Sequence, residues 1–513
     1  MVEPYKNTQE LDHSRPFKVH TWSNYPEVNA FIDQIYNDHL SDLSRISKGN
    51  LKPLLLDLYV CWYYDPDMVL AVHRDTAKYK KGTRYRAIHV SPKMITVMDI
   101  LEERGFIYRS QALHFPEEGI GRITRIWPTD KLIKLFENAT FDIFAIGLHP
   151  RTETVVMHDA DKNDIEYKDN RNTSKWRKDL AKYNKLLEET YIDIANLEEP
   201  YIDRKPKRGS KKNTRISINQ QNKHVFRVFN EDWSHGGRFY GSWWQSIGKD
   251  YRKHIRINNE RTIEIDYSGF HIALLYAQSG VNYFQEYGLK ADPYDIHVPE
   301  INDPDYKRWV IKQLMLFFIN CSSEDEAIKV MQTYPTPDNE NRPEGLVLSN
   351  VLLRSILDQL KAKHSEISDH FCTGVGSKLQ NIDSRMTYNL INTFTNDQIP
   401  LLTIHDSYIV AEQHTEFLFS EMLKEWKAVA LKGKHIKGTG LASIETDLAY
   451  TGVKQLGYRG EAYDIEEERG GKKHIKAMEL KEKELKPCKG YLQRLSLWNR
   501  WLERNVQSSD SGA

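Results

Sequence analysis

Asp266 is well placed along the chain to bind a hard cation. It ends a stretch, residues 262–266, in which polar residues alternate with Ile263 and Ile265, the pattern of a half-buried strand. Residues 271–279 then have the composition of a buried helix. A carboxylate between a strand and a helix lies where backbone and side-chain oxygens converge, and such oxygens suit a hard cation. The alternative is a solvated strand-end aspartate or a helix N-cap.

Asp406 is a second carboxylate of this kind. It stands in His405-Asp406-Ser407, between two apolar runs at 399–404 and 408–410, as in a β-hairpin whose tip carries the polar group. A carboxylate in an apolar frame is costly unless it meets a cation or stays in water. The alternative is an ordinary turn aspartate.

Arg308 and Lys312 could supply positive charge for a polyphosphate. Asp303 and Pro304 form a cap and a first-turn proline, which predicts a helix that continues from residue 306 to 319. Positions four apart lie on one helix face, and the rest of this helix is apolar. An exposed stripe on a half-buried helix would have the same pattern.

A Gly- and aromatic-rich segment, residues 236–247, has the residue types that contact nucleic acid. Glycines allow close approach of another chain, arginine binds phosphates or base edges, and Trp and Tyr stack on bases. Its candidate contacts are Arg238, Tyr240 and Gln245. The alternative is a tight turn with a core aromatic cluster.

Composition restricts the protein class. The 513 residues, 40% hydrophobic and 28% charged, predict a globular chain of two to four domains. Four scattered cysteines support neither a zinc site nor a disulfide framework. No apolar run approaches the length of a membrane span and no signal peptide is evident, so we expect a reduced cytoplasmic protein without a membrane partner. The net charge of zero does not decide for or against nucleic acid.

The N-terminal region, residues 1–138, has the outline of a winged-helix-like module. A helix at 91–104, strands at 105–108 and 119–127 with a polar tip between them, and a helix after Thr129 follow in that order. Such modules bind duplex DNA or serve as protein-interaction domains, and Arg122 and Arg125 are the candidate wing contacts.

Two further segments flank the region that carries the motifs. Residues 139–215 combine a charged helix, 173–189, with a basic run at 204–215 that is either a phosphate contact or a linker. Residues 449–513 form a charged C-terminal extension, and its amphipathic helix, 491–504, should dock onto the body or onto a protein partner.

In order and spacing, the motifs of residues 216–448 resemble the palm and fingers of family A (DNA polymerase I-like) polymerases. The family's motif A, D-Y-S-x-x-E, is similar to Asp266-Tyr267-Ser268-Gly269-Phe270, with His271 in place of the glutamate. Its other motifs, a glycine–arginine segment, R-x-x-x-K, R-M-x-x-N and H-D-E, are similar to the segments that contain Arg238 and Gln245, Arg308 and Lys312, Arg385 and Asn389, and His405-Asp406-Ser407.

The resemblance implies an α+β right-hand polymerase with an antiparallel palm sheet, helical fingers and two-metal catalysis. Asp266 and Asp406 would hold Mg²⁺ or Mn²⁺, completed by the Tyr267 carbonyl. The incoming nucleoside triphosphate would contact Arg308, Lys312 and His271. The primer–template, expected to be DNA, would contact Arg238, Tyr240, Gln245, Arg385, Asn389 and His405.

The departures from the family leave alternatives open. His271 replaces the glutamate that helps to exclude ribonucleotides, and His-Asp-Ser resembles single-subunit RNA polymerases. We expect a template-directed DNA polymerase of a mobile element. The alternatives are an RNA polymerase or primase, a template-independent nucleotidyltransferase, and a catalytically inactive nucleic-acid-binding protein.

Overall fold

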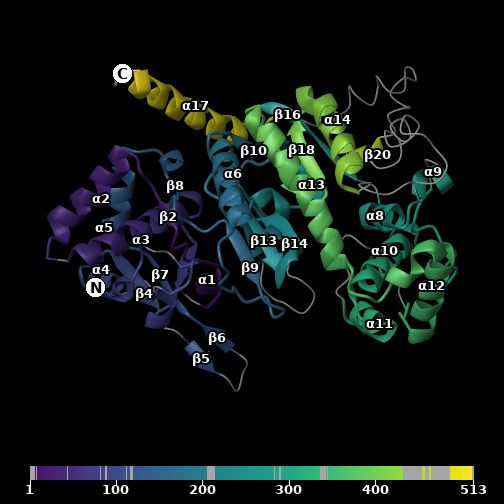
Figure 1. The fold of residues 1–513 in the computed structure, drawn as a ribbon. Coiled ribbons are helices and arrows are strands. Elements are labelled where there is room, and N and C mark those ends of the chain that lie inside the picture. Colours follow the sequence, from purple (N-terminus) through teal and green to yellow (C-terminus); the bar gives the residue numbers. More distant parts are fainter. Residues whose placement is uncertain are drawn as a thin grey trace.

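The computed structural model describes residues 6–510 apart from 7, 43, 81, 87–88, 111–112, 116–119, 205–213, 268, 282, 288–290, 335–342, 344, 431–452, 457–461 and 464–485. Its secondary structure is mixed α and β, as the sequence predicted, and most strand pairs are antiparallel. From left to right, Figure 1 shows the N-terminal elements, the central sheets with α6 and α13, and the helices α10–α12. We describe these parts in that order.

The N-terminal part has its own hydrophobic core, built from the helices α2, α3, α4 and α5 and a four-stranded sheet of order β1-β3-β7-β4. The predicted helix start at Thr129 is confirmed, because its hydroxyl accepts a hydrogen bond from the Leu132 amide at 3.4 Å. The elements are α1 (Thr8–Asp12), β1 (Ser14–Pro16), β2 (Thr21–Trp22), α2 (Pro26–His39), α3 (Arg45–Tyr64), β3 (Val69–Val72), η1 (Thr76–Tyr79), α4 (Lys93–Glu103), β4 (Ile107–Ser110), β5 (Leu113–Phe115), β6 (Ile120–Arg122), β7 (Thr124–Pro128) and α5 (Asp130–Glu137).

A three-stranded sheet of order β14-β13-β9 and the helix α6 connect this part to the centre. The predicted charged helix is confirmed as α6, which begins with an Asn170 capping box and packs its apolar face on this sheet. The elements are η3 (Ile143–Ala145), β8 (Gly147–Leu148), β9 (Val155–His158), α6 (Arg171–Glu188), β11 (Tyr201–Arg204), β12 (Thr214–Ser217), β13 (Phe226–Asn230), β14 (Asp232–Tyr240), η4 (Trp243–Ser246) and α7 (Lys249–Arg252).

The central sheet is antiparallel in every pairing that the structure describes, and its strand order is β10-β15-β16-β18-β17. In addition, β19 pairs with β16, and β20 pairs with β19. It confirms the predicted strand before Asp266 and the predicted hairpin around Asp406. The strands are β10 (Ile192–Ile194), β15 (Ile255–Ile257), β16 (Glu260–Tyr267), β17 (Leu402–Ile404), β18 (Ser407–Ala411), β19 (Val453–Leu456) and β20 (Ala462–Tyr463).

Helices α8–α12 form the right-hand part of Figure 1, and together with α13 and α14 they share one core with the apolar side of β16. The predicted start of α10 is confirmed, because the Asp303 carboxylate accepts from the Tyr306 amide at 2.7 Å. The elements are α8 (Phe270–Gln278), α9 (Tyr283–Tyr287), α10 (Pro304–Asn320), α11 (Glu324–Thr333), α12 (Asn350–Lys363), η5 (Ser365–His370), α13 (Gly376–Asn396), η6 (Glu412–His414), α14 (Thr415–Glu425) and η7 (Trp426–Ala430).

The C-terminal helix, α17 (Lys489–Asp510), docks onto the body of the chain, one of the two outcomes that its sequence allowed. Its Tyr491, Trp498 and Trp501 are buried in a cluster with Tyr191 and Ala195. Among the residues with a described placement, no helix is both long enough and apolar enough to cross a membrane.

Candidate functional site

Strand pairing brings Asp266 and Asp406 together. In the β16–β18 register, Asp266 lies opposite Ser407, the residue after Asp406. The Tyr267 amide donates to the Asp406 carbonyl at an N···O distance of 3.4 Å. His405 adopts φ 58° and turns the chain between β17 and β18. The two acids are far apart along the chain, but they lie side by side where β16 ends and β18 begins.

Glu264 and Ser407 hold this register. The Ser407 hydroxyl donates to Glu264 Oε1 at 2.6 Å, and Arg252 donates to both Glu264 oxygens at 2.9 and 3.0 Å. Ser407, which departs from the H-D-E motif, thus links β18 to β16. We assign Glu264 a positioning role for the two strands, because its carboxylate is already bound by these groups.

Helix α10 turns Lys312 toward the acids. Partial desolvation and the Arg308 cation lower the pKa of Lys312, while Asp266, Asp292 and Asp406 oppose that shift. Lys312 Nζ lies 5.6 Å and Arg308 Cζ 5.7 Å from the centroid of the Tyr294 ring. Arg308 forms an ion pair with Asp292. The helix therefore presents two exposed cations on the same side as the aspartates.

A buried carboxylate, Asp383, holds the other cation of the site. Asp383 on α13 is only 1% exposed and accepts from Arg238 Nε at 2.9 Å. His271 Nε2 lies 3.2 Å from Arg238 Nη2 and 3.4 Å from Asp383 Oδ2. Burial is the largest single influence and lowers the pKa of Arg238, but the charge and hydrogen bonds of Asp383 together with the charge of Asp406 outweigh it, so the net shift is upward. Arg238 stays charged and fixed beside the hairpin.

His405 lies between Arg238 and the aromatic ring of Tyr240. The His405 and Tyr240 rings are 5.4 Å apart in an edge-on arrangement. Burial, and after it the Arg238 charge, lower the pKa of His405, and Asp406 and Asp383 only partly oppose them. The imidazole is therefore neutral at neutral pH. Tyr240 is 39% exposed and offers a stacking face next to it.

Three of the predicted nucleic-acid contacts lie apart from this cluster. The Gln245 amide group donates to the Phe239 and Thr403 carbonyls at 2.9 and 3.0 Å, and its oxygen accepts from the Gly241 amide. Asn389 donates to Glu425 at 2.7 Å. Arg385 is exposed on α13. Gln245 and Asn389 thus have partners inside the protein, whereas Arg385 faces solvent.

Two regions outside the cluster bear on the other predicted contacts. Arg125 is buried and donates to the Leu11 carbonyl at 3.0 Å, so it does not extend from a wing. Arg215 pairs with Asp65 at 2.7 Å and Asp203 at 2.8 Å. Most of the basic run, residues 205–213, lies outside the described residues.

Sequence reasoning missed Asp383, Asp292 and Tyr294. The available signal for Asp383 is its place on α13, where it and Thr387 share the face that packs on β14 and the hairpin. A buried acid on a helix needs a cation, and Arg238 was a candidate from its own motif. Asp292 and Tyr294 follow no periodic pattern, because they lie in an irregular segment between α9 and α10.

The donor groups of the site fit a hard divalent cation. Asp266 and Asp406 supply carboxylate oxygens of the kind that Mg²⁺ and Mn²⁺ accept. The Tyr267 ring is buried and its hydroxyl donates to the Met422 carbonyl at 2.6 Å, so only its main chain can reach the site. Within the described part of the chain, no group of three or more His, Cys, Asp or Glu side chains has the arrangement of a metal site. Water and substrate oxygens would complete the ligands of such an ion.

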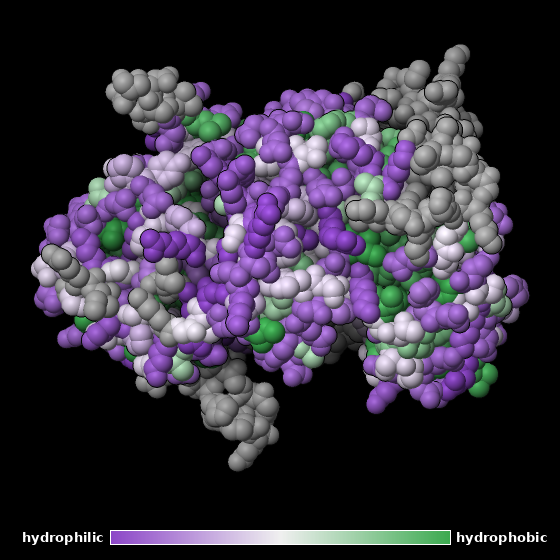
Figure 2. Space-filling model, in the orientation of Figure 1, coloured by the Kyte–Doolittle hydropathy of each residue, from purple (hydrophilic) through white to green (hydrophobic). Residues whose placement is uncertain are grey.

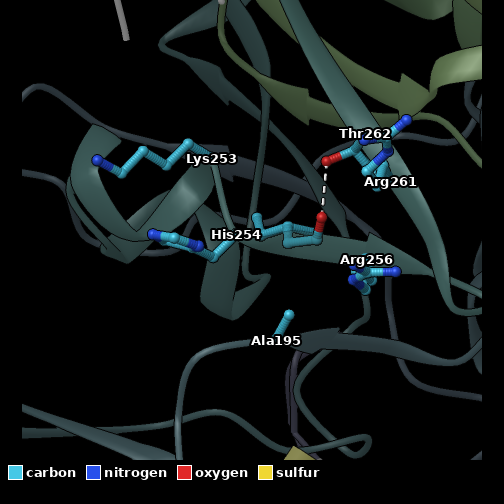
Figure 3. A pocket seen from close by; sticks show the side chains of 7 residues that line it. Ala195, Lys253, His254, Arg256, Arg261 and Thr262 are labelled. Carbon is cyan, nitrogen blue, oxygen red and sulfur yellow. Dashed lines mark hydrogen bonds between the residues drawn. The ribbon is translucent and has the colours of Figure 1, made fainter. Parts of the chain in front are cut away.

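The opposite end of β16 has a basic recess that is too small for a ligand. Its volume is about 10 Å³, room for one water molecule. Lys253, Arg256 and Arg261 surround it, and the Thr262 hydroxyl donates across β16 and β15 to the Ile255 carbonyl at 2.8 Å (Figure 3). We therefore assign this recess no part in the site.

Comparison with known proteins does not identify a relative. No protein-family model, no curated protein and no solved structure matches the chain. The functional argument therefore rests on the geometry of the residues themselves.

Proposed function

We propose that the protein is a metal-dependent nucleotidyltransferase of the family A polymerase type, which extends a primer on a DNA template with deoxynucleoside triphosphates. The observation that carries the proposal is the pairing of Asp266 with the Asp406 hairpin, with Lys312 near enough for the charges of both acids to act on it. An antiparallel sheet with two adjacent acids opposite a cationic helix is the arrangement that two-metal phosphoryl transfer needs.

Each charged group has a distinct task in this reaction. Asp266 and Asp406 hold the divalent ions, which when bound activate the attacking hydroxyl and stabilise the leaving pyrophosphate. Lys312 and Arg308 bind the β and γ phosphates, where fixed positive charge stabilises the transition state. Arg308 is held by Asp292 until phosphate competes for it.

The groups around Asp383 contact the sugar and the primer end. Asp383 orients Arg238 and lies next to His271. Its carboxylate is therefore already bound and is not free to face the nucleotide. His271 borders the sugar in place of the family's glutamate. Neutral His405 and the Tyr240 ring contact the primer terminus.

The N-terminal part supplies a second contact with nucleic acid or with a protein. The chain order α3, β3, α4, β4, the β5–β6 hairpin and β7, with the sheet order β3-β7-β4, supports a winged-helix-like module. Arg122, its candidate contact, lies in β6, and its side chain is outside the described part of the structure.

A primer-extension assay tests the proposal. Wild type, D266N, D406N and the control D397N, which changes an exposed aspartate after α13, are compared with dNTPs or NTPs, with DNA, RNA or no template. We expect Mg²⁺-dependent incorporation of dNTPs on DNA, lost by about 10³-fold in D266N and D406N only. Incorporation that survives in both variants would remove these acids from the mechanism. Binding of nucleic acid without incorporation by wild type would favour the inactive binding protein.

A further inference from the structure

Helix α6 carries a stripe of positive charge that the candidate site does not use. Five exposed cations lie within an arc of about 80° on the helix, at about 100° per residue, and extend along roughly 21 Å of its axis. They are Arg171, Lys175, Lys178, Lys182 and Lys185. We call this set the α6 stripe.

The α6 stripe points away from the protein core. The buried residues of α6, among them Leu180, Tyr183 and Leu187, occupy the opposite side of the helix and pack on the β13–β14 sheet. Hydrophilic residues cover the middle of the face shown in Figure 2, where α6 lies in Figure 1. The cations are therefore open to a ligand from solvent.

Much of this charge is uncompensated. Lys175 pairs with Asp179 at 2.7 Å and Lys185 with Glu189 at 3.6 Å. In contrast, Arg171, Lys178 and Lys182 form no side-chain hydrogen bond or ion pair with any residue that the structure describes.

One end of the α6 stripe meets the helix that carries Asp383. Lys175 Nζ donates to the Tyr388 hydroxyl of α13 at 2.8 Å. Tyr388 lies three residues after the exposed Arg385, and positions three apart are neighbours on a helix. Arg385 thus lies on α13 beside the residue that the stripe contacts, and it adds an exposed cation to this end of the stripe.

The other end of the α6 stripe borders a groove of about 780 Å³ between α6, the N-terminal part and α17. Lys178 and Lys185 form one wall, and Arg151, His149 and Trp22 face them. Trp22 is half-buried and has Lys52 Nζ 4.0 Å from its ring centroid. Three acids line the groove, and two of them have partners outside the α6 stripe. Glu153 forms an ion pair with Arg177 at 2.8 Å, and Glu188 is hydrogen-bonded to His224 at 2.6 Å. The third, Glu189, is the partner of Lys185.

We propose that the α6 stripe and this groove bind a single strand of nucleic acid that continues from the candidate active site. Regularly spaced cations follow a phosphate backbone, and an aromatic ring in a basic groove stacks a base without sequence preference. The volume is that of a site for small ligands. In duplex DNA the bases are paired and stacked on one another, so none is free to stack on Trp22.

The experiment measures binding in the full-length D406N chain, so that failure of catalysis and failure of this site are distinguishable. Fluorescence anisotropy of labelled dT20, and of a 20-base-pair duplex, is followed against NaCl concentration. The variants are K178A/K182A in the stripe and W22A in the groove. The control is K329A/K424A, which removes two exposed lysines from α11 and α14.

We expect K178A/K182A to lower the salt slope for dT20 by about 1.4, because each single-strand phosphate contact contributes about 0.7. W22A should weaken dT20 binding by roughly 5- to 150-fold without changing the slope, with W22F restoring most of it. K329A/K424A should match the parent. Equal slopes in the stripe and control variants, or duplex binding that depends on Trp22 as dT20 binding does, would overturn the proposal.

Discussion

Lys312 is the site residue whose function should depend most visibly on pH. It binds phosphate only when protonated, and desolvation together with Arg308 places its pKa below the ordinary value of 10.5. Its positive charge is therefore lost at a lower pH than that of a lysine in water. We expect incorporation to fall in alkaline solution before pH 10.5, and K312R, whose guanidinium stays charged, to move that fall upward. Rates measured from pH 7 to 10.5 at constant ionic strength check this. Coincident profiles would contradict a phosphate-binding role for Lys312.

Asp383 should matter for stability as well as for activity. D383N removes the negative charge that pairs with Arg238. Because the Arg238 side chain is only 14% exposed, leaving its charge unpaired should cost about 3 kcal/mol of unfolding free energy. The control E412Q breaks the half-exposed Arg261–Glu412 pair at 3.2 Å and should cost less than about 1 kcal/mol. Urea denaturation of both variants compares the two costs. Equal costs would mean that Asp383 does not hold a buried charge.

At the scale of elements, the site depends on the close approach of β14 and α13. Gly237 has φ 87°, and a Cβ there would lie 2.7 Å from Phe229 Cε1 and 2.8 Å from Ser384 Oγ. Only glycine allows this contact, and the next residue along β14 is Arg238. The glycine-rich segment is thus not a simple turn. At Gly237 the close approach is to α13 and not to a nucleic-acid strand.

G237A should therefore push α13 away from β14 and separate Asp383 from Arg238. We expect losses in both the thermal midpoint and the incorporation rate. G248A is the matched control, since a Cβ at Gly248 meets nothing within 4 Å and should change neither quantity. If G237A and G248A behaved alike, the β14–α13 contact would not position the site.

The sequence predicted the elements well where a local signal was strong. The Asp303 cap, the Thr129 cap and the alternation before Asp266 each have a short-range cause, and the structure has the corresponding element at each place. Contacts between elements have no such signal. Nothing local indicates that Gln245 would bind main-chain carbonyls or that Asn389 would bind Glu425. Asp383 pairs with a residue 145 positions away, so only the fold could join them.

At the scale of the whole molecule, α17 joins the N-terminal part to the centre. Arg494 donates to Asp193 in β10 at 2.8 Å, while the Trp501 ring lies 6.1 Å from Tyr25 and 5.8 Å from Phe144. Arg504 also pairs with Asp142 at 2.7 Å. The helix closes one side of the groove beside α6. Its docking should therefore set how the two parts unfold together.

W501A should weaken this connection. Truncation of a buried tryptophan costs about 3–5 kcal/mol, and we expect one unfolding transition in calorimetry to become two. L492A, at a residue 49% exposed on the same helix, should leave a single transition. A single transition in W501A, shifted no more than in L492A, would show that α17 does not couple the parts.

The central claim is that Asp266 and Asp406 act as one metal-holding unit, and a double-mutant cycle tests it most directly. Groups that act together give strongly non-additive losses. Incorporation rates in Mg²⁺ are measured for wild type, D266N, D406N and D266N/D406N, with thermal midpoints to verify folding. The account predicts that each single variant loses about 10³-fold and that the double variant loses no more than either. Losses that multiply in the double variant, or a single variant with wild-type rates, would contradict it.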